Sequence, residues 1–185
     1  MNTVVTSREA ILEVSRRLIR QKGWGAVNIR SVAGECGVSV GSIYNYFDSK
    51  AELVAATVES VWCDIFHFSE QENTFDSFTE CIQWVFASLK EGEKKYPGFF
   101  ALHPAGFAGG EKAGGQRRMA RSWEHMRQGF CMVLEKDRSI RRDAFDESFT
   151  RENLADMVFS LILSEMLQKK YDSEIILEMV RRLIY

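Results

Sequence analysis

The chain has 185 residues, of which 45% are hydrophobic and 27% are charged, with 2 prolines and 13 glycines. This composition excludes a disordered or fibrous chain, and no apolar run approaches the roughly 20 residues of a membrane-spanning helix. The formal charge of −2 is unevenly spread, because residues 1–50 carry 7 Lys and Arg against 4 Asp and Glu and the remainder is net acidic. A basic first quarter favours a small module for an anionic polymer, attached to a second part.

Helical periodicity runs through almost the whole chain. Apolar residues at positions 11, 14, 18 and 19 share one face of a first helix, which Lys22 and Gly23 should end. Asn28 should cap a second helix over 29–35, Ser39 a third over 40–47, and Asp48 or Ser49 a fourth over 50–68. Further helices are expected from about 75 to 89 and over 116–136, 151–170 and 173–185. No segment alternates as a strand does, so we predict an all-α fold.

The sequence lacks the residue patterns of catalytic and metal sites. None of the four cysteines, at 36, 63, 81 and 131, forms a C-x-x-C pair, and the three histidines lie far apart. No nucleophile motif, phosphate loop or dinucleotide fingerprint is present. We therefore expect no enzyme, no metal and no cofactor, with the cysteines as buried reduced thiols. The polar start of the chain lacks the pattern of a signal peptide, so we expect a cytoplasmic location and no association with membranes.

The segment from residue 29 to 46, IRSVAGECGVSVGSIYNY, has the spacing of a helix-turn-helix. Ala33 lets a second helix cross closely, Gly37 can adopt a positive φ in the tight turn, and Ile43 packs back onto the first helix. The second helix would expose a face without acidic residues, which suits the major groove of DNA and its phosphates. That face carries Val40, Gly41, Ser42, Tyr44, Asn45 and Tyr46.

Residues 8–54 resemble the N-terminal domain of the TetR (tetracycline repressor-like) transcriptional regulators. The family pattern is a leading helix ending in Gly-aromatic, then T-[IV]-R-x-[IV]-A-x-x-[AC]-G-V-[ST]-x-G-[ST]-[IL]-Y-x-[HY]-F-x-[SN]-K-x-x-L. Asn28 replaces the usual threonine, and both residues are good helix caps. The matching residues are Gly23, Trp24, Ile29, Arg30, Val32, Ala33, Cys36, Gly37, Val38, Ser39, Gly41, Ser42, Ile43, Tyr44, Tyr46, Phe47, Ser49, Lys50 and Leu53. The rest of the chain resembles the family only in layout.

The resemblance implies a dimeric regulator, more often a repressor than an activator, that binds a palindromic operator in double-stranded DNA. Arg30 would reach a phosphate or a base edge, while Val40 and Ser42 would read bases. The implied phosphate contacts are Tyr44, Tyr46 and Lys50. For Asn45, a contact to the DNA backbone and a purely solvated side chain remain open. The complete predicted DNA-binding set is Asn28, Arg30, Ser39, Val40, Gly41, Ser42, Tyr44, Asn45, Tyr46 and Lys50.

We assign residues 1–49 to this DNA-binding domain and residues 50–185 to a helical domain for ligand binding and dimerisation. The helix expected over 151–170 is apolar around much of its circumference, so a partner subunit should cover part of it. Paired helices from two subunits would form a four-helix bundle. The predicted interface residues are Leu154, Val158, Leu161, Ile162, Ile176, Met179, Val180 and Leu183.

A pocket for a small apolar or aromatic effector is expected between the helices that start near 50, 75, 97 and 116. Its predicted lining is Phe86, Phe99, Phe100, His103, Trp123, Met126 and Phe130. Such residues at helical spacing are also typical of an ordinary core, and His103 could equally be a surface histidine. Two functions therefore remain open at this point: a regulator released from DNA by a ligand, and a DNA-binding interaction protein on the same fold that needs no effector.

Overall fold

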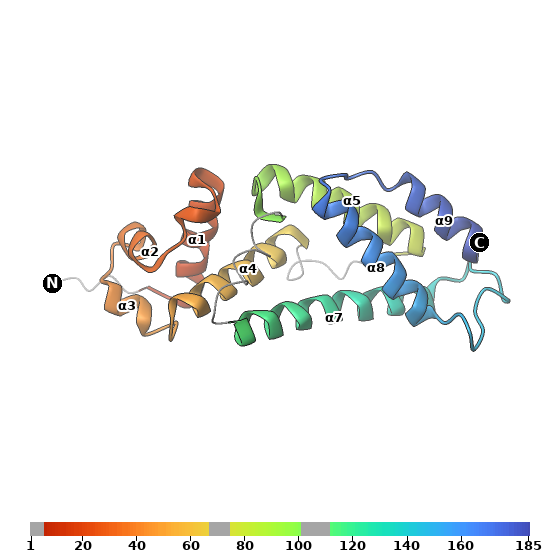
Figure 1. Cartoon of the computed structure of the whole chain (residues 1–185), viewed down its shortest axis with the longest axis horizontal. Coiled ribbons are helices and arrows are strands. Elements are labelled where there is room, and N and C mark those ends of the chain that lie inside the picture. The colour runs from red at the N-terminus through yellow and green to blue at the C-terminus, as the bar shows by residue number, and fades with distance from the viewer. Residues whose placement is uncertain (1–5, 67–74, 101–111) are drawn as a thin grey trace. The chain divides into compact units, whose positions relative to one another are not determined.

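A computed structural model describes residues 6–66, 75–100 and 112–185, with only the backbone described for 112–122. Within these ranges every regular element is a helix (Figure 1), so the predicted all-α class is confirmed. The elements are α1 Arg8–Lys22, η1 Trp24–Ala26, α2 Ile29–Cys36, α3 Val40–Tyr44, α4 Lys50–Phe66, α5 Phe78–Lys95, α7 Lys112–Lys136, α8 Arg151–Leu167 and α9 Glu174–Ile184.

The described chain separates into two compact units. The first unit contains residues 6–66 together with residues 92–100 and the first turns of α7. The second unit contains residues 75–91 and 121–185, and therefore most of α5 and α7 with all of α8 and α9. The division differs from the boundary after residue 49 that we infer for the functional domains, because α4 packs on α1.

Local signals in the sequence place the helix ends of the first unit. Ser7, Asn28 and Ser39 each accept a hydrogen bond from a backbone N–H of the helix that they cap. Two differences from the sequence prediction occur. The third helix ends at Tyr44, because the next turn tightens and two successive N–H groups share the Ile43 carbonyl. The short η1 turn was not predicted.

The core of the first unit forms around α1, which contacts both α2 and α4. The apolar face of α1 is fully buried, and the one polar residue on that face, Ser15, donates its hydroxyl to the Ile11 carbonyl at 2.9 Å. A buried hydroxyl with a partner costs little, so Ser15 is compatible with this face. Buried core residues of the unit include Ile11, Leu18, Ile19, Val32, Ala33, Ile43, Phe47, Leu53 and Val61.

The core of the second unit is built from α5, α7, α8 and α9. The rings of Phe78 and Phe130 meet edge to face at 5.6 Å, and those of Trp123 and Phe159 do so at 6.0 Å. These pairs join α5 to α7 and α7 to α8. Arg141 caps the C-terminal end of α9, since its guanidinium donates to the Leu183 carbonyl at 2.7 Å.

Asp137 is a buried carboxylate that ties together three parts of the second unit. It accepts hydrogen bonds from the Phe78 N–H at 2.9 Å, from the Ser139 N–H at 2.9 Å and from the Tyr185 hydroxyl. Burial by itself raises the pKa of this carboxyl group, but the hydrogen bonds from Ser139, Tyr185 and Phe78 outweigh burial and hold the pKa below its ordinary value.

Asp137→Asn should lower the free energy of unfolding by about 1–3 kcal/mol at pH 7, because a neutral amide offers one acceptor oxygen to several donors. A lowered carboxyl pKa stabilises the fold above the unfolded value near 3.9, and this contribution disappears as pH falls through the folded value. The difference in unfolding free energy between the variant and the wild type should therefore become smaller below about pH 4. Urea unfolding at pH 7 and pH 3 measures it, with exposed Glu147→Gln as control. An equal gap at both pH values would contradict this role.

Candidate nucleic-acid interface

The turn between α2 and α3 has the geometry that the spacing predicts. Gly37 adopts φ 67° and ψ 28°, in the left-handed region, where a side chain would be strained. The Val38 N–H donates to the Ala33 carbonyl at 3.0 Å, which closes the end of α2. Ala33 and Ile43 are both buried, as expected for the two residues at the crossing. The segment is therefore a helix-turn-helix.

The exposed side of α3 and the residues that flank this helix carry most of the predicted DNA-contacting residues. Val40, Tyr44 and Tyr46 are large side chains left 41%, 47% and 38% exposed. Between Gly37 and Phe47 the sequence contains no acidic residue. The predicted residues that lie exposed are Arg30, Ser39, Val40, Gly41, Tyr44, Asn45, Tyr46 and Lys50, while Asn28 and Ser42 are half-buried.

Two of the predicted contacts are also capping groups. The Asn28 side chain accepts from the Ser31 N–H at 3.0 Å and donates to the Ser31 hydroxyl at 2.8 Å, so both ends of the amide are used at the start of α2. The Ser39 hydroxyl accepts from the Ser42 N–H at 3.1 Å and lies 2.9 Å from the Ser42 hydroxyl. These bonds fix the first turn of α3.

The Tyr46 hydroxyl is used differently from the prediction. It donates to the carbonyl oxygen of Thr6 at 2.5 Å. A phosphate oxygen only accepts hydrogen bonds, and a phenol has a single proton to donate. In this structure the Tyr46 hydroxyl is therefore not available as a donor to a phosphate, and a motif comparison could not reveal this because the acceptor is a backbone atom.

Most cations of the first 50 residues form ion pairs within the first unit. Arg16 and Arg20 pair with Glu13, Arg17 and Lys22 pair with Glu35, and Arg8 lies 4.0 Å from Glu52. The Lys22 ammonium, 3.0 Å from Glu35, holds the pKa of that exposed carboxyl group below its usual value.

Arg30 and Lys50 are the remaining two cations, and neither has an ion pair with any residue that the structure describes. They stand at the second residue of α2 and the first residue of α4. The two cations without an ion pair are both exposed, and they flank in sequence the segment from Gly37 to Phe47, which lacks acidic residues. This arrangement is typical of a surface that receives phosphate groups.

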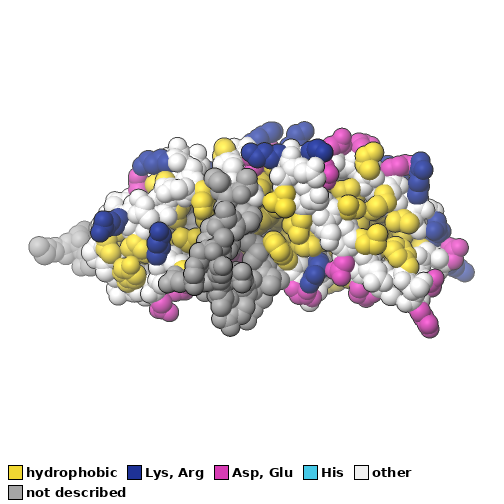
Figure 2. All heavy atoms as spheres, viewed as in Figure 1, with side chains coloured by type: hydrophobic (Ala, Val, Ile, Leu, Met, Phe, Trp, Pro, Cys, Tyr) yellow, Lys and Arg dark blue, Asp and Glu magenta, His cyan; other side chains and the backbone are white. Residues whose placement is uncertain are grey.

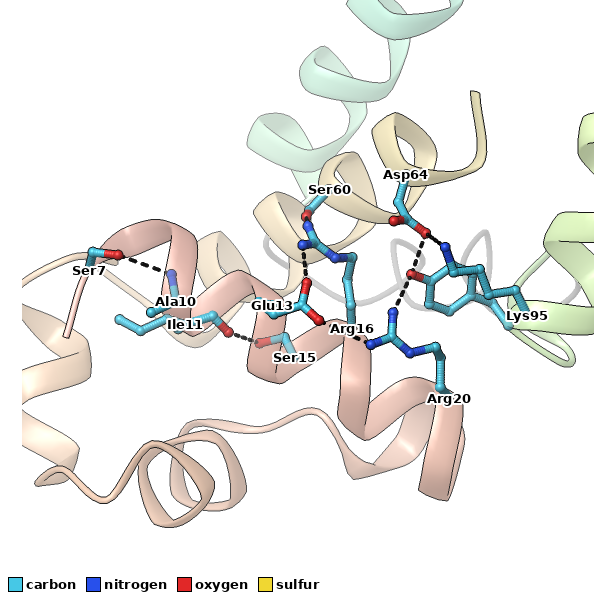
Figure 3. Close-up of polar contacts among 11 residues, drawn as sticks. Ser7, Ala10, Ile11, Glu13, Ser15, Arg16, Arg20, Ser60, Asp64 and Lys95 are labelled. Atoms are coloured by element: carbon cyan, nitrogen blue, oxygen red, sulfur yellow. Dashed lines mark hydrogen bonds and ion pairs between the residues drawn. The ribbon is translucent and has the colours of Figure 1, made fainter. Parts of the chain in front are cut away.

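A second feature of the first unit is a chain of polar contacts that joins α1, α4 and the end of α5 (Figure 3). The hydroxyl of the buried residue Tyr96 accepts from Arg20 at 3.2 Å and donates to the Asp64 carboxylate at 2.7 Å. The Lys95 ammonium also lies 2.6 Å from Asp64. Burial alone raises the pKa of Asp64, yet the bonds from Lys95 and Tyr96 hold it below its ordinary value.

The same chain continues along α1 to a second contact with α4. Arg20 donates to Glu13 at 3.1 Å, and Glu13 also accepts from Arg16, whose guanidinium reaches the Ser60 hydroxyl of α4. One side of α1 is therefore joined to α4 directly through Ser60 and indirectly through Tyr96, while α1 also contacts α2 of the helix-turn-helix.

An aromatic cluster lies beside these polar contacts. Trp62 of α4 packs against Phe66, Phe99 and Phe100 at 5.4–5.7 Å between ring centroids, and Trp24 meets Phe99 at 5.8 Å. A Cβ at Gly92 would lie only 3.0 Å from the Ile65 side chain, so the glycine permits the end of α5 to approach α4 this closely. Residues 92–100 are thus part of the core that supports the helix-turn-helix.

The predicted effector residues are divided between the two units. Phe99 and Phe100 belong to the aromatic cluster of the first unit, whereas Phe86, Trp123, Met126 and Phe130 belong to the second, and His103 lies outside the described residues. Neither of two open cavities of about 240 and 340 Å³ on the helix-turn-helix and between α1 and α4 is lined by any of them. The structure therefore does not gather this set into one described site.

The predicted dimer residues also fall into two groups. Leu154, Val158, Ile162, Ile176 and Val180 are buried within their own chain, which leaves little of their surface for a partner. Leu161 is exposed, and Met179 and Leu183 are half-buried. Periodicity identified α8 and α9 as apolar without indicating which side their own chain covers.

Between Asp156 and Lys169, the exposed residues at the C-terminal part of α8 are all uncharged. Figure 2 shows hydrophobic side chains gathered over this helix. Its exposed apolar residues are accompanied by serines and a glutamine, with no ionic side chain between them. The residues of this α8 strip are Met157, Ser160, Leu161, Ser164, Leu167 and Gln168.

The four thiols have no sign of chemical activation. The expectation of buried thiols holds for Cys81 alone, because Cys36 and Cys131 are half-buried and Cys63 is exposed. Partial loss of contact with water raises the pKa of Cys36, Cys63 and Cys131, and burial raises that of Cys81 to about 12. A protonated thiol is a poor nucleophile and a poor metal ligand. In the described residues no three acidic, cysteine or histidine side chains gather as metal ligands. None of the helices in those ranges is long and apolar enough to span a membrane.

The helix-turn-helix segment matches a known family of regulatory proteins. Residues 11–57 match the family described as "Bacterial regulatory proteins, tetR family". The N-terminal domain of the chain belongs to this family.

Three similar proteins illustrate how far the likeness extends. The chain is 40% identical over 52 residues to the uncharacterized HTH-type transcriptional regulator YerO of Bacillus subtilis, covering 28% of this chain and 18% of YerO. It is 25% identical over 134 residues to the nucleoid occlusion factor SlmA of Mannheimia succiniciproducens, covering 69% and 60%. The crystal structure of BioQ with its double-stranded DNA operator has the same fold, with a TM-score of 0.58 at 15% identity over 90% of this chain and 87% of BioQ. The chain spans less than two thirds of each curated relative that it matches.

Removal of one hydroxyl tests the polar chain. Tyr96→Phe should lower the free energy of unfolding by about 1–3 kcal/mol, because Asp64 loses a donor and Arg20 loses an acceptor in a buried setting while the ring is kept. Urea unfolding followed by circular dichroism measures the loss. Tyr44→Phe is the matched control, since that hydroxyl is exposed and should change stability by less than about 0.5 kcal/mol. Equal stability of the two variants would show that the Tyr96 hydroxyl bonds contribute nothing.

Proposed function

We propose that this chain is a sequence-specific, DNA-binding transcriptional regulator that reads the major groove with α3. The observation that carries the proposal is the exposed, acid-free side of α3, with the unpaired cations Arg30 and Lys50 nearby, on a helix-turn-helix of the tetR family. In such motifs the second helix enters the major groove while flanking groups hold the phosphates. The family membership and the charge arrangement support the same surface independently.

The contacts divide by chemistry into readers and anchors. Val40 presents methyl groups that suit the methyl of thymine, and the Ser42 hydroxyl can serve either base type. Arg30, Tyr44 and Lys50 supply donors for phosphate oxygens, which fix the register without carrying sequence information. The named structural relative BioQ was crystallised with a DNA operator, which is compatible with this use of the fold.

The readers and anchors should respond differently to substitution. Ser42→Ala or Val40→Ala should change the preferred sequence and cost about 1–3 kcal/mol at a contacted base pair. Lys50→Met should weaken binding to all sequences alike and reduce the slope of log affinity against log salt by about 1. Binding-site selection followed by salt titrations measures both. A Ser42→Ala variant with the wild-type preference and affinity would remove Ser42 as a reader.

The second part of the proposal is a homodimer that binds a palindromic operator. A surface that lacks charge and exposes several apolar side chains is expensive to leave in water, and the α8 strip has both properties. Ile175, Met179 and Leu183 form a neighbouring row on α9, spaced four residues apart. Closed two-fold pairing through such a strip would match a two-fold symmetric DNA site.

A charge within the α8 strip should disrupt this dimer. Leu161→Glu is expected to yield monomers or insoluble protein, because two carboxylates would face an apolar interface across the two-fold axis. Multi-angle light scattering at micromolar concentration measures the state. Glu147→Lys, a charge change on an exposed loop, is the control and should remain dimeric. A monomeric wild type would refute the dimer.

The third part is control by a small apolar or aromatic effector, which would make the chain a repressor released from its operator. The contacts of Tyr96 and Phe99 with α1 and α4 support a route for such control, because α5 starts in the second unit and ends in the first. A ligand that favours a different position of α4 would change how α3 is presented to DNA. Its effect is limited to its differential affinity for the two states.

Linkage makes this part testable with any bound effector. If the effector weakens operator binding, then the operator must weaken effector binding by the same factor, and about 1–3 kcal/mol of coupling is typical. A melting-temperature screen of aromatic compounds finds candidates, since a ligand of the native state raises that temperature. Titration calorimetry with and without operator then measures the coupling. Equal effector affinity in both titrations would mean that the site is not a switch.

One observation favours a second function. The likeness to SlmA covers 69% of this chain, and that relative is named as a nucleoid occlusion factor rather than as a transcriptional regulator. The alternative is a DNA-binding protein on the same fold that acts through a protein partner and needs no effector. A screen that finds no stabilising compound, together with retained DNA binding, would favour this alternative.

A further inference from the structure

We infer that Tyr46 acts on DNA binding as a positioning residue, by holding the start of α1 against the end of α3, and not as a phosphate contact. The inference rests on the proposed DNA-binding function and deepens it. The distance of 2.5 Å between the Tyr46 hydroxyl and the Thr6 carbonyl oxygen is that of a short, well-formed hydrogen bond. The two residues are 40 positions apart, so the bond joins two separate elements.

A second contact ties the same two places together. The Arg8 guanidinium lies 4.7 Å from the centroid of the Phe47 ring, and its Nη2 atom lies 4.0 Å from the Glu52 carboxylate. Phe47 is fully buried, so the ring that Arg8 covers is fixed in the core. Thr6 and Arg8 are thus both held by the segment from Tyr46 to Glu52, which connects the reading helix α3 to α4.

That connecting segment is itself well anchored. The Glu52 carboxylate accepts from the Asp48 N–H at 2.6 Å, and the Ser49 hydroxyl accepts from the Glu52 N–H at 3.1 Å. Lys50, one of the two unpaired cations, lies within it. The contacts that hold the start of α1 against this segment therefore also help to fix the position of Lys50, the first residue of α4, relative to α3.

Tyr44 provides the contrast within the same motif. It is 47% exposed, and no hydrogen bond of its hydroxyl is found among the residues that the structure describes. Its proton is free to reach a phosphate, whereas the proton of Tyr46 is already donated. The two tyrosines, for both of which the family resemblance implies a phosphate contact, therefore have different roles in this chain.

The test compares Tyr46→Phe with Tyr44→Phe in the full chain, with a duplex obtained by binding-site selection as the probe. Failure to select any duplex would overturn the proposed function and, with it, the role of Tyr46 in DNA binding, whereas the exchange measurement described next tests the Tyr46–Thr6 bond in the free protein by itself. Each variant should weaken binding by about threefold to tenfold, the effect of one hydrogen bond. Unchanged affinity of Tyr46→Phe would overturn the inference.

Amide exchange in the free protein separates positioning from contact. The Ala10 N–H is bonded to the Ser7 hydroxyl at 3.1 Å, and the Ile11 N–H is bonded to the Ser7 carbonyl at 3.0 Å (Figure 3 shows the first of these). If Tyr46 holds Thr6, then Tyr46→Phe should speed the exchange of these two amides without DNA, while Tyr44→Phe should not. Wild-type exchange rates in Tyr46→Phe, together with weakened DNA binding, would assign Tyr46 to direct contact instead.

Replacing single DNA phosphates with uncharged methylphosphonates tests the same distinction from the side of the DNA. If a tyrosine hydroxyl contacts one phosphate directly, then the binding free energy lost by the Phe variant and that lost by replacing this phosphate with a methylphosphonate are not additive. We expect such a phosphate for Tyr44 and none for Tyr46. Conversely, Tyr46→Phe and Arg8→Met should be non-additive with each other, because both release the start of α1. Additivity of that pair, or a phosphate coupled to Tyr46, would overturn the inference.

Discussion

The first unit depends on the interactions of a single helix, α1, because each of its sides is fixed to a different part of the chain. Its apolar face is buried against α2 and α4, and its polar edge is bonded to Tyr96 and to Ser60. Hydrophobic burial is non-directional, so packing alone would leave the helix free to slide or rotate slightly. The polar contacts are directional, and they fix the rotation that packing does not.

Ion pairs of the α1 arginines and lysine determine which cations of the first 50 residues keep no acidic partner. Glu13, Glu35 and Glu52 form ion pairs with all five cations of α1, while Arg30 and Lys50 have no ion pair among the described residues. Exposed ion pairs contribute little to stability, so the value of these pairs lies elsewhere. They lower the net positive charge along α1, and they leave Arg30 and Lys50 as the cations without an ion pair among the described residues.

The sequence predicted the parts of this structure that depend on near neighbours. Helix caps at Ser39 and Asn28 and the left-handed turn at Gly37 are set by contacts within four residues, and all three were predicted. The bonds among positions 20, 64 and 96 leave no such local pattern, because each residue alone is typical of a solvated helix. Tyr46 shows a further limit: the motif predicted its exposure correctly, but its partner is a carbonyl, a group that every residue carries.

The position of Tyr96, Phe99 and Phe100 bears on what the DNA-binding domain is. The family match ends at residue 57, yet Trp24 and Trp62 complete their contacts only with residues beyond 90. Without those residues, two tryptophan faces would be exposed to water, and the buried partner of Arg20 and Asp64 would be missing. The packing of the helix-turn-helix unit therefore depends on where residues 92–100 lie, because these residues complete its core. The core of the first unit therefore couples the reading surface to the end of α5 through ordinary packing, whatever signal α5 carries.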